Sequence, residues 1–402
     1  MVPNSRYPLC PLSSAIASLE SGISVNAEDR PARPEEHGVL RVSAIGEGRF
    51  LPKENKAILS SELRRMGPAI AAGDILVSRA NTLELVGLAA RARGDSPNLH
   101  LSDKTWRVQL REREEGTARW LVHVINSPHV RAILRRRATG TSGSMKNIGQ
   151  RTFLGICVPL PPKETRSRIA DVLDAIVRRA DLLADLTTAT RHLKRGLMQQ
   201  LISGRLRLPG FSAPWKVHRL GDLFSERTES NRHDLPLLSI TADRGVVRRD
   251  ELERRDTSNP DKTAYLRIAP GDIGYNTMRM WQGVSALSSL EGIVSPAYTI
   301  CVPNKWIDNR FAAILFKHGP VVHLFRRYSQ GLVDDTLTLR FHEFAQIRVS
   351  IPEVREQRNI AAIMAAVDAE IRLLEDLQNA LQRQRSSILD KLLSGELPIP
   401  AA

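Results

Sequence analysis

The sequence predicts an α+β protein made of two related halves, each a mixed globular part followed by a long helix. A shift of 191 residues, the separation of Pro161 from Pro352, aligns the halves without a gap from Trp120 on Phe311 onward. Repeats of about 20–50 residues mark solenoids, so this much longer period indicates duplicated domains. Short β-prone runs broken by Gly and Pro fill the globular parts. We therefore predict approximate internal twofold symmetry.

Each helix begins after a proline, which lacks a backbone donor and holds the preceding residue in extended geometry. Apolar residues then recur at steps of three and four until Ser203-Gly204 in the first half and Ser394-Gly395 in the second. Near forty residues at about 1.5 Å each give a length of roughly 60 Å, more than one small domain covers. We predict that the helices pack as an antiparallel coiled-coil pair, and two helices docked separately are the alternative. The interface positions are Ile169, Leu173, Ile176, Leu183, Leu186, Leu193, Leu197, Ile360, Met364, Val367, Ile371, Leu374, Leu377, Leu381 and Ile388.

These boundaries divide the chain into globular residues 1–159, helical residues 160–207, globular residues 208–350 and helical residues 351–402. The front parts of the globular segments share little beyond one Gly-Asp-Ile sequence, at Gly73 and at Gly271, which are separated by 198 residues. The helices match closely. We infer that the helices serve identical partners and that the globular parts serve different ones.

The chain is strongly basic, with a formal net charge of +14 and a pI near 10.2. Nucleic acid is the simplest polyanion for such a protein to bind. No apolar run approaches the roughly twenty residues of a membrane-spanning helix, and the N-terminus does not resemble a signal peptide, so we expect a cytoplasmic protein without a membrane partner. Cys10, Cys157 and Cys301 lie far apart and are expected to be buried apolar side chains, with no disulfide framework or metal site.

The sequence offers little catalytic chemistry. It has no Gly-Lys pair, hence no P-loop, and neither the Asn-Pro-Pro nor the Asp-Pro-Pro sequence with which amino-methyltransferases hold the target amine. Glu54-Asn55-Lys56 is half of a nuclease signature, but Pro260-Asp261 lies on the wrong side of it. We predict a protein that is not an enzyme and has no catalytic residues, metal or cofactor of its own.

DNA contacts are expected at basic, amide-rich positions, because phosphates need cations and base edges need paired donors and acceptors. One such cluster follows a basic helix in each half and includes a Gly/Ser loop, whose backbone amides can approach a phosphate. A second follows the Gly-Asp-Ile strand. The first cluster comprises Arg131, Arg135, Arg136, Arg137, Lys146 and Asn147, with Arg326, Arg327, Tyr328 and Gln330 in the second half; the second comprises Arg79 and Asn81, with Asn276, Arg279, Trp281 and Gln282.

At these residues the chain resembles the specificity subunits of type I restriction-modification systems. The evidence is the doubled helix entry, Leu160-Pro161-Pro162-Lys163-Glu164 before Ile169-Ala170 and Ile351-Pro352 with Glu356-Gln357 before Ile360-Ala361. Tyr275–Gly283 with Gly292–Tyr298 resembles one recurrent type of target recognition domain, and Gly73–Arg79 resembles another. One departure is Thr165, where the first helix lacks the Gln that the second keeps as Gln357.

The resemblance implies that each recognition domain reads one half of an interrupted, asymmetric double-stranded DNA site. It further implies that the helices set the spacing and dock two adenine-methyltransferase subunits, which restriction subunits join. S-adenosylmethionine, ATP and Mg²⁺ would be bound by those partner subunits. The alternatives are a stand-alone DNA-binding regulator and a self-sufficient nuclease or methyltransferase.

Overall fold

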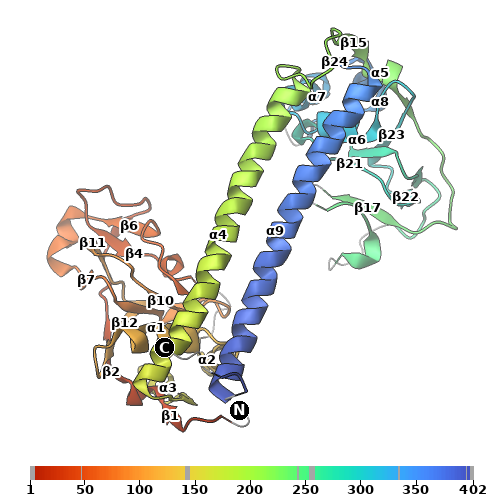
Figure 1. Cartoon of the computed structure of the whole chain (residues 1–402). Helices are drawn as coiled ribbons and strands as arrows, with labels where there is room; N and C mark the ends of the chain where they lie inside the picture. Colours follow the sequence, from red (N-terminus) through yellow and green to blue (C-terminus); the bar gives the residue numbers. More distant parts are fainter. Residues whose placement is uncertain are drawn as a thin grey trace. The chain divides into compact units, whose positions relative to one another are not determined.

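The computed structural model describes residues 5–46, 48–140, 145–241, 244–252, 259–333, 336–394 and 396–398. The chain forms two compact units, the first being Met1–Ala184 with Asp376–Ala402 and the second Asp185–Glu375. Each unit joins one globular part to one half of each long helix, α4 (Lys163–Ile202) and α9 (Val354–Ser394) (Figure 1). In each globular part most strands come before a group of short helices, so the α+β class is confirmed. The units divide both helices and so do not follow the four linear segments drawn from the sequence.

The first unit contains two sheets of five strands each. Its strands are β1 (Leu9–Pro11), β2 (Ile16–Ser21), β3 (Ala27–Glu28), β4 (Gly38–Leu40), β5 (Gly48–Arg49), β6 (Asn55–Ile58), β7 (Ala69–Ile70), β8 (Ile75–Ser78), β9 (Ala80–Asn81), β10 (Ala89–Arg91), β11 (Ser96–His100), β12 (Thr105–Leu110), β13 (Lys146–Asn147) and β14 (Cys157–Pro159), and its short helices are α1 (Glu115–Ile125), α2 (Pro128–Arg137) and α3 (Gln150–Leu154). The sheet orders are β2-β12-β8-β10-β5 and β3-β6-β4-β11-β7, and β1-β14 and β13-β9 form separate pairs. All four side chains of β8 are buried, as expected for the apolar run that follows Gly73-Asp74.

The second unit is built around the four-stranded sheet β16-β23-β20-β21. Its strands are β15 (Lys216–Arg219), β16 (Phe224–Glu226), β17 (Leu238–Thr241), β18 (Gly245–Arg248), β19 (Leu266–Ile268), β20 (Ile273–Asn276), β21 (Ser285–Leu287), β22 (Gly292–Val294), β23 (Tyr298–Pro303) and β24 (Arg348–Ile351), and its helices are α5 (Leu220–Leu223), α6 (Asn309–Leu315), α7 (Gly319–Tyr328), α8 (Phe341–Gln346) and the 3₁₀ turn η5 (Met280–Gln282). The sequence duplication is visible in the cores, because Phe311 and Phe344 are fully buried here and their counterparts Trp120 and Phe153 are fully buried in the first unit.

The Gly-Asp-Ile sequence forms the same turn in both units. Gly73 and Gly271 adopt φ of +88° and +95°, a left-handed conformation that favours glycine. The Asp74 carboxylate accepts a hydrogen bond from the Ala71 amide at 2.9 Å, and the Asp272 carboxylate accepts one from Ala269 at 2.8 Å. Each aspartate also pairs with an arginine, Asp74 with Arg107 at 3.0 Å and Asp272 with Arg227 at 2.8 Å. The turn therefore fixes where β8 and β20 begin.

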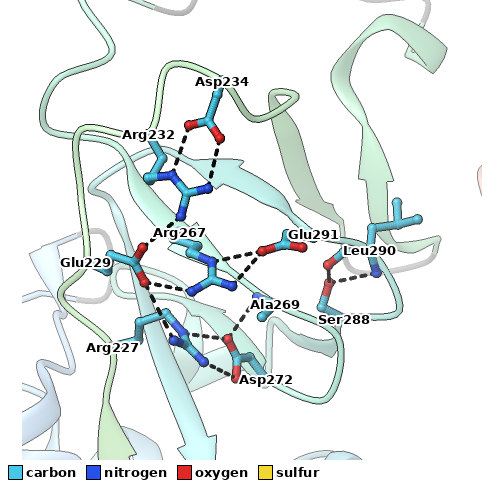
Figure 2. A network of polar contacts seen from close by, with 10 residues as sticks. All are labelled: Arg227, Glu229, Arg232, Asp234, Arg267, Ala269, Asp272, Ser288, Leu290 and Glu291. Atoms are coloured by element: carbon cyan, nitrogen blue, oxygen red, sulfur yellow. Dashed lines mark hydrogen bonds and ion pairs between the residues drawn. The ribbon is translucent and has the colours of Figure 1, made fainter.

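In the second unit, Asp272 ends a ladder of alternating charges (Figure 2). Arg227 donates to both Asp272 oxygens at 2.8 and 3.1 Å, and the ladder continues through Glu229 to Arg267 at 2.8 Å. Asp272 is 3% exposed, whereas the side chain of Asp234, at the far end beyond Arg232, is 62% exposed. The network links the chain after β16 to β19 and to the Gly-Asp-Ile turn.

We expect Asp272→Asn to lower the free energy of unfolding by about 3 kcal/mol, because it leaves the charge of Arg227 without its buried partner. Asp234→Asn is the matched control and should change stability little, because an exposed ion pair is screened by water. Urea denaturation of both variants measures the difference. Equal stabilities would show that the buried pair contributes nothing beyond the exposed one.

The first turns of the two long helices make equivalent contacts. The Gln of the family's helix-entry pattern is missing at Arg166 and not, as expected from the sequence, at Thr165. The residue equivalent to Gln357 is Arg166, whereas Thr165 corresponds to Glu356. Gln357 Nε2 donates to the carbonyl of Pro352 at 2.8 Å, and Arg166 Nε donates to the carbonyl of Pro161 at 2.7 Å. The first helix therefore keeps this contact with a different donor.

Within the second unit the halves of α4 and α9 run antiparallel. Arg191 pairs with Glu375 and Lys194 with Asp368, so the residue number falls along one helix as it rises along the other. Glu356, 1% exposed, accepts hydrogen bonds from Arg207 at 2.8 and 2.9 Å, which joins the first turn of α9 to the segment that follows α4. This arrangement is the predicted antiparallel pairing.

The predicted helix interface is only partly correct. Seven of its positions are buried, and Leu183, Leu197, Val367, Leu381 and Ile388 are half-buried. Leu186, Leu193 and Leu377 were expected inside but are 48%, 57% and 45% exposed. The middle of α4 instead buries Thr187 and Thr190, whose small side chains occupy the inward positions there. The buried positions are Ile169, Leu173, Ile176, Ile360, Met364, Ile371 and Leu374.

The cysteines are free, but burial was predicted correctly only for Cys301. Cys10 is half-buried and Cys157 is exposed. Cys157 lies on β14, whose only pairing within the described residues is with the short edge strand β1. Alternate side chains of such a strand face water, which the sequence of a three-residue strand does not reveal.

Candidate DNA interface

A glycine loop of the same construction follows the basic helix in both units. In the first unit the backbone of Thr139 pairs with Asn147, and in the second the backbone of Gln330 pairs with Thr338. These two pairs are equivalent under the shift of 191 residues. The loops follow α2 and α7, each of which has consecutive arginines in its last turn. The duplication therefore preserves a closed loop at the end of a basic helix.

A glycine begins each loop because the backbone turns sharply there. Gly140 has φ of +134° and Gly331 has φ of +147°. A Cβ atom at Gly140 would lie 2.6 Å from the carbonyl oxygen of Met145, and one at Gly331 would lie 2.7 Å from that of Thr336. Both positions therefore exclude a side chain by contact with backbone as well as by conformation.

Each loop is joined to the segment that follows the Gly-Asp-Ile strand. The Ile148 amide donates to the carbonyl of Arg79 at 3.1 Å, and the Leu339 amide donates to the carbonyl of Thr277 at 2.9 Å. The donors are related by the shift of 191 and the acceptors by the shift of 198. The two clusters predicted separately from the sequence are thus brought together in each unit by the same hydrogen bond.

In the first unit the predicted DNA contacts separate into exposed and structural residues. Arg136 and Arg137 are exposed at the end of α2, and Arg135 is exposed but pairs with Glu84 at 2.7 Å. Arg79 is half-buried and donates to the carbonyl of Asp103 at 3.1 Å. Lys146 and Asn147 are half-buried in the loop strand β13, where Lys146 Nζ donates to the carbonyl of Gly140 at 2.6 Å. The loop residues Thr141–Ser144 lie outside the described residues.

Two residues predicted as DNA contacts in this unit are buried instead of exposed. Arg131 is 6% exposed, and its guanidinium donates to the backbone carbonyls of Val86 and Glu84. Asn81 is 4% exposed, donates to Val42 and Ser78, and accepts from the Thr82 amide at 2.8 Å. Both side chains are buried and hydrogen-bonded to backbone groups, which gives each of them a structural role.

In the second unit the corresponding residues meet around η5 and α7. Trp281, half-buried, donates from Nε1 to the Met278 carbonyl at 3.1 Å, and the Arg326 guanidinium lies 5.4 Å from the centre of its ring. Asn276 accepts a hydrogen bond from the Met278 amide at 2.9 Å. The side chains of Trp281 and Asn276 therefore stabilise the conformation of residues 276–281. Arg279, Gln282, Arg326, Arg327 and Gln330 are exposed, and Tyr328 is half-buried.

The sequence did not predict a basic cavity of about 570 Å³ in the first unit, between α1, α2 and the halves of both long helices. The buried His123 lies at its wall, with Nε2 2.8 Å from Asp174 and Nδ1 3.2 Å from Arg385. Burial lowers the pKa of His123. The residues come from distant parts of the chain, so no local sequence pattern identifies the cavity. Its charged lining residues are Arg49, Arg131, Arg135, Asp181, Arg383 and Arg385.

Among the described residues, no group of three or more His, Cys, Asp or Glu side chains is arranged to hold a metal ion. Among the same residues, no helix combines the length and apolar character required to cross a membrane.

Comparison with solved structures identifies the architecture. The crystal structure of a type I restriction-modification S subunit from M. genitalium aligns with a TM-score of 0.57 over 97% of both chains, at 15% identity. This chain has the fold of a type I specificity subunit. A second solved structure comes from work on complex assembly and conformational transition of the type I R-M system. It aligns with a TM-score of 0.60 over 99% of this chain and 100% of that one, at 18% identity. The resemblance stated from the sequence is confirmed.

Sequence comparison also finds similarity to a type I specificity subunit, over part of the chain. The specificity subunit of the type I restriction enzyme EcoEI from Escherichia coli is 24% identical over 198 residues, or 49% of this chain. The match covers 33% of that relative's length, so the chain spans about a third of it. No protein-family model matches the chain.

Proposed function

We propose that this chain is a non-catalytic subunit that gives a type I restriction-modification complex its DNA sequence specificity. The observation that carries the proposal is the duplicated loop assembly, in which a closed glycine loop, a basic helix and the segment after a Gly-Asp-Ile strand are joined by the same hydrogen bond. A repeated basic surface on unlike globular parts suits two unlike DNA half-sites, as paired modules read paired sites in other DNA-binding proteins. The overall charge of +14 favours the same ligand.

In this proposal the long helices set the distance between half-sites and dock two adenine-methyltransferase subunits. Support comes from leucines that the duplication keeps exposed. Leu182 and its equivalent Leu373 are 67% and 59% exposed, and Leu186 and its equivalent Leu377 are 48% and 45% exposed. Leucines exposed at equivalent places on both helices are suited to two copies of one apolar partner surface.

The remaining chemistry would belong to the partners. Methyltransferase subunits would bind S-adenosylmethionine, and restriction subunits would bind ATP and Mg²⁺, with the whole complex in the cytoplasm. The exposed arginines of α2 and α7 also fit a stand-alone DNA-binding regulator, but such a regulator gives no reason for equivalent exposed leucines on both helices.

A reconstitution experiment tests the proposal. The chain alone, with S-adenosylmethionine, should bind DNA without methylating it, and methylation of adenine in an interrupted site should require an added methyltransferase subunit. Methylation by the chain alone would refute a non-catalytic role. Specific DNA binding without any association with a methyltransferase would favour the regulator.

We expect single substitutions of the exposed leucines to change the stoichiometry of that complex. Leu182→Ser and Leu373→Ser should each remove one of two methyltransferase subunits, and the double variant should remove both, because each leucine serves one copy. Native mass spectrometry of the co-expressed subunits measures this. Leu193→Ser is the control, because Leu193 is 57% exposed but its equivalent position holds Gln384. Loss of both subunits from one single variant would contradict two equivalent docking places.

A further inference from the structure

A buried side chain in the first turn of α9 ties this helix to the globular part of the second unit. Gln357 is 0% exposed, and its Nε2 donates to the carbonyls of Pro352 at 2.8 Å and of Trp306 at 3.1 Å. Its Oε1 accepts a hydrogen bond from the Asp308 amide at 2.8 Å. Asp308 caps α6, so the Gln357 amide, with both protons and its oxygen bonded, joins the first turn of α9 to the start of α6.

The first unit joins α4 to α1 at the equivalent positions but with different chemistry. Arg166, the equivalent of Gln357, donates from Nε to the carbonyl of Pro161 at 2.7 Å. Its Nη1 donates to the hydroxyl of Thr117, in the first turn of α1, at 3.2 Å. Thr117 is the equivalent of Asp308. The duplication therefore keeps a bond between the same two positions, a charged one in the first unit and a neutral one in the second.

The side chains beside this bond also differ between the units. A Cβ atom at Gly116 would lie 2.7 Å from the Cβ atom of Ser167, so α1 and α4 approach closely through small residues. The equivalent positions in the second unit hold Ile307, which is buried, and Arg358, which is exposed. Two unlike sets of residues thus make one junction, which indicates that the junction itself is what both units require.

These contacts hold the long helix and the globular part of each unit at one angle, and the length of the helices amplifies any change in it. The helices α4 and α9 have 40 and 41 residues and are therefore about 60 Å long. A change of about 5° in the direction of such a helix would move its far end by about 5 Å, which exceeds the roughly 3.4 Å between neighbouring base pairs. A small loosening of the junction is therefore enough to alter a spacing by one base pair.

We propose that Gln357 and Arg166 are positioning residues that fix how many unread base pairs separate the two half-sites. Each holds its helix at one angle to the globular part, so that a single gap length brings both recognition surfaces onto their half-sites. Loss of the hydrogen bonds lets this angle vary. Neighbouring gap lengths then become acceptable, while the bases read within each half-site stay the same. This inference rests on the proposed function.

The test measures the preferred gap of the full chain. The chain selects its site from a randomised pool of duplexes, and its affinity is then measured for that site with the gap lengthened or shortened by one base pair. The unchanged chain should lose about tenfold or more in affinity at either altered gap, because a displaced half-site presents mismatched base pairs. Gln357→Met keeps the size of the side chain and removes its hydrogen bonds, so most of this loss should disappear. Asn359→Met is the matched control, because Asn359 is exposed two residues further along α9.

The first unit provides a rescue experiment. Arg166→Met should broaden the gap preference in the same way, whereas Arg166→Gln should restore a single gap. The reason is that Gln357 reaches the equivalent proline carbonyl from the equivalent position. Urea denaturation of each variant is measured in parallel, because a residue that only stabilises the fold would change stability and leave the preferred gap as it is. If Gln357→Met does not fold, the two Arg166 variants decide the question.

The outcomes separate this inference from the proposed function. An unchanged gap preference in a folded methionine variant overturns the assignment of that residue, and so does equal broadening by Asn359→Met. Altered base preference within a half-site would assign the residue to base reading instead of spacing. These results leave the proposed function standing. Failure of the unchanged chain to select any interrupted site overturns both proposals.

Discussion

Gly331→Ala should abolish reading of one DNA half-site while leaving the other intact. The added Cβ would lie 2.7 Å from the Thr336 carbonyl oxygen, at a φ of +147° that side chains rarely adopt. The loop must therefore open, and such local strain costs about 1–3 kcal/mol, or roughly 5- to 150-fold in affinity for the specific site. Gly140→Ala should have the same effect on the opposite half-site, because its Cβ would meet the Met145 carbonyl at 2.6 Å.

Binding to duplexes in which one half-site at a time is scrambled measures this effect. Each variant should become insensitive to scrambling of its own half-site and keep its sensitivity to the other. Gly319→Ala and Gly94→Ala are the controls, since a Cβ at either position meets nothing within 4 Å. If one glycine variant lost both half-sites, the two units would not read DNA independently.

Replacing Arg136 and Arg137 with alanine should flatten the salt dependence of DNA binding. Both side chains are exposed at the end of α2, beside the loop of the first unit. A cation that neutralises a phosphate contributes about 0.9 to the slope of log affinity against log salt concentration, so losing two contacts should reduce the slope by about 1.8. The loss should not depend on the DNA sequence, because phosphate contacts carry no sequence information.

Titrations of specific and unrelated duplexes over a range of salt concentrations test this expectation. Arg131→Ala is an informative comparison, because Arg131 is buried against the carbonyls of Glu84 and Val86. It should reduce stability and leave the salt slope of the remaining folded protein unchanged. An unchanged slope in the double variant would assign Arg136 and Arg137 to the solvated helix face.

Much of the candidate interface was predictable because the duplication was visible in the sequence. Matching Gly140 with Gly331 identified both loops, and matching Gly73 with Gly271 identified both turns. The sequence did not show that these features meet, because Ile148 and Arg79 bond across nearly seventy residues of chain. It also placed the residue equivalent to Gln357 one position too early, at Thr165 instead of Arg166.

Local pattern alone determined that this chain is a tandem duplication with two long helices, since periodicity, proline stops and glycine turns act over a few neighbouring residues. Only the tertiary structure decided which side chains are available to a partner. Arg131 and Asn81 are buried although their side chains are polar, and Leu186 and Leu377 are exposed although their side chains are apolar. Burial depends on what distant segments pack against a position, and neither the type of a residue nor its spacing contains that information.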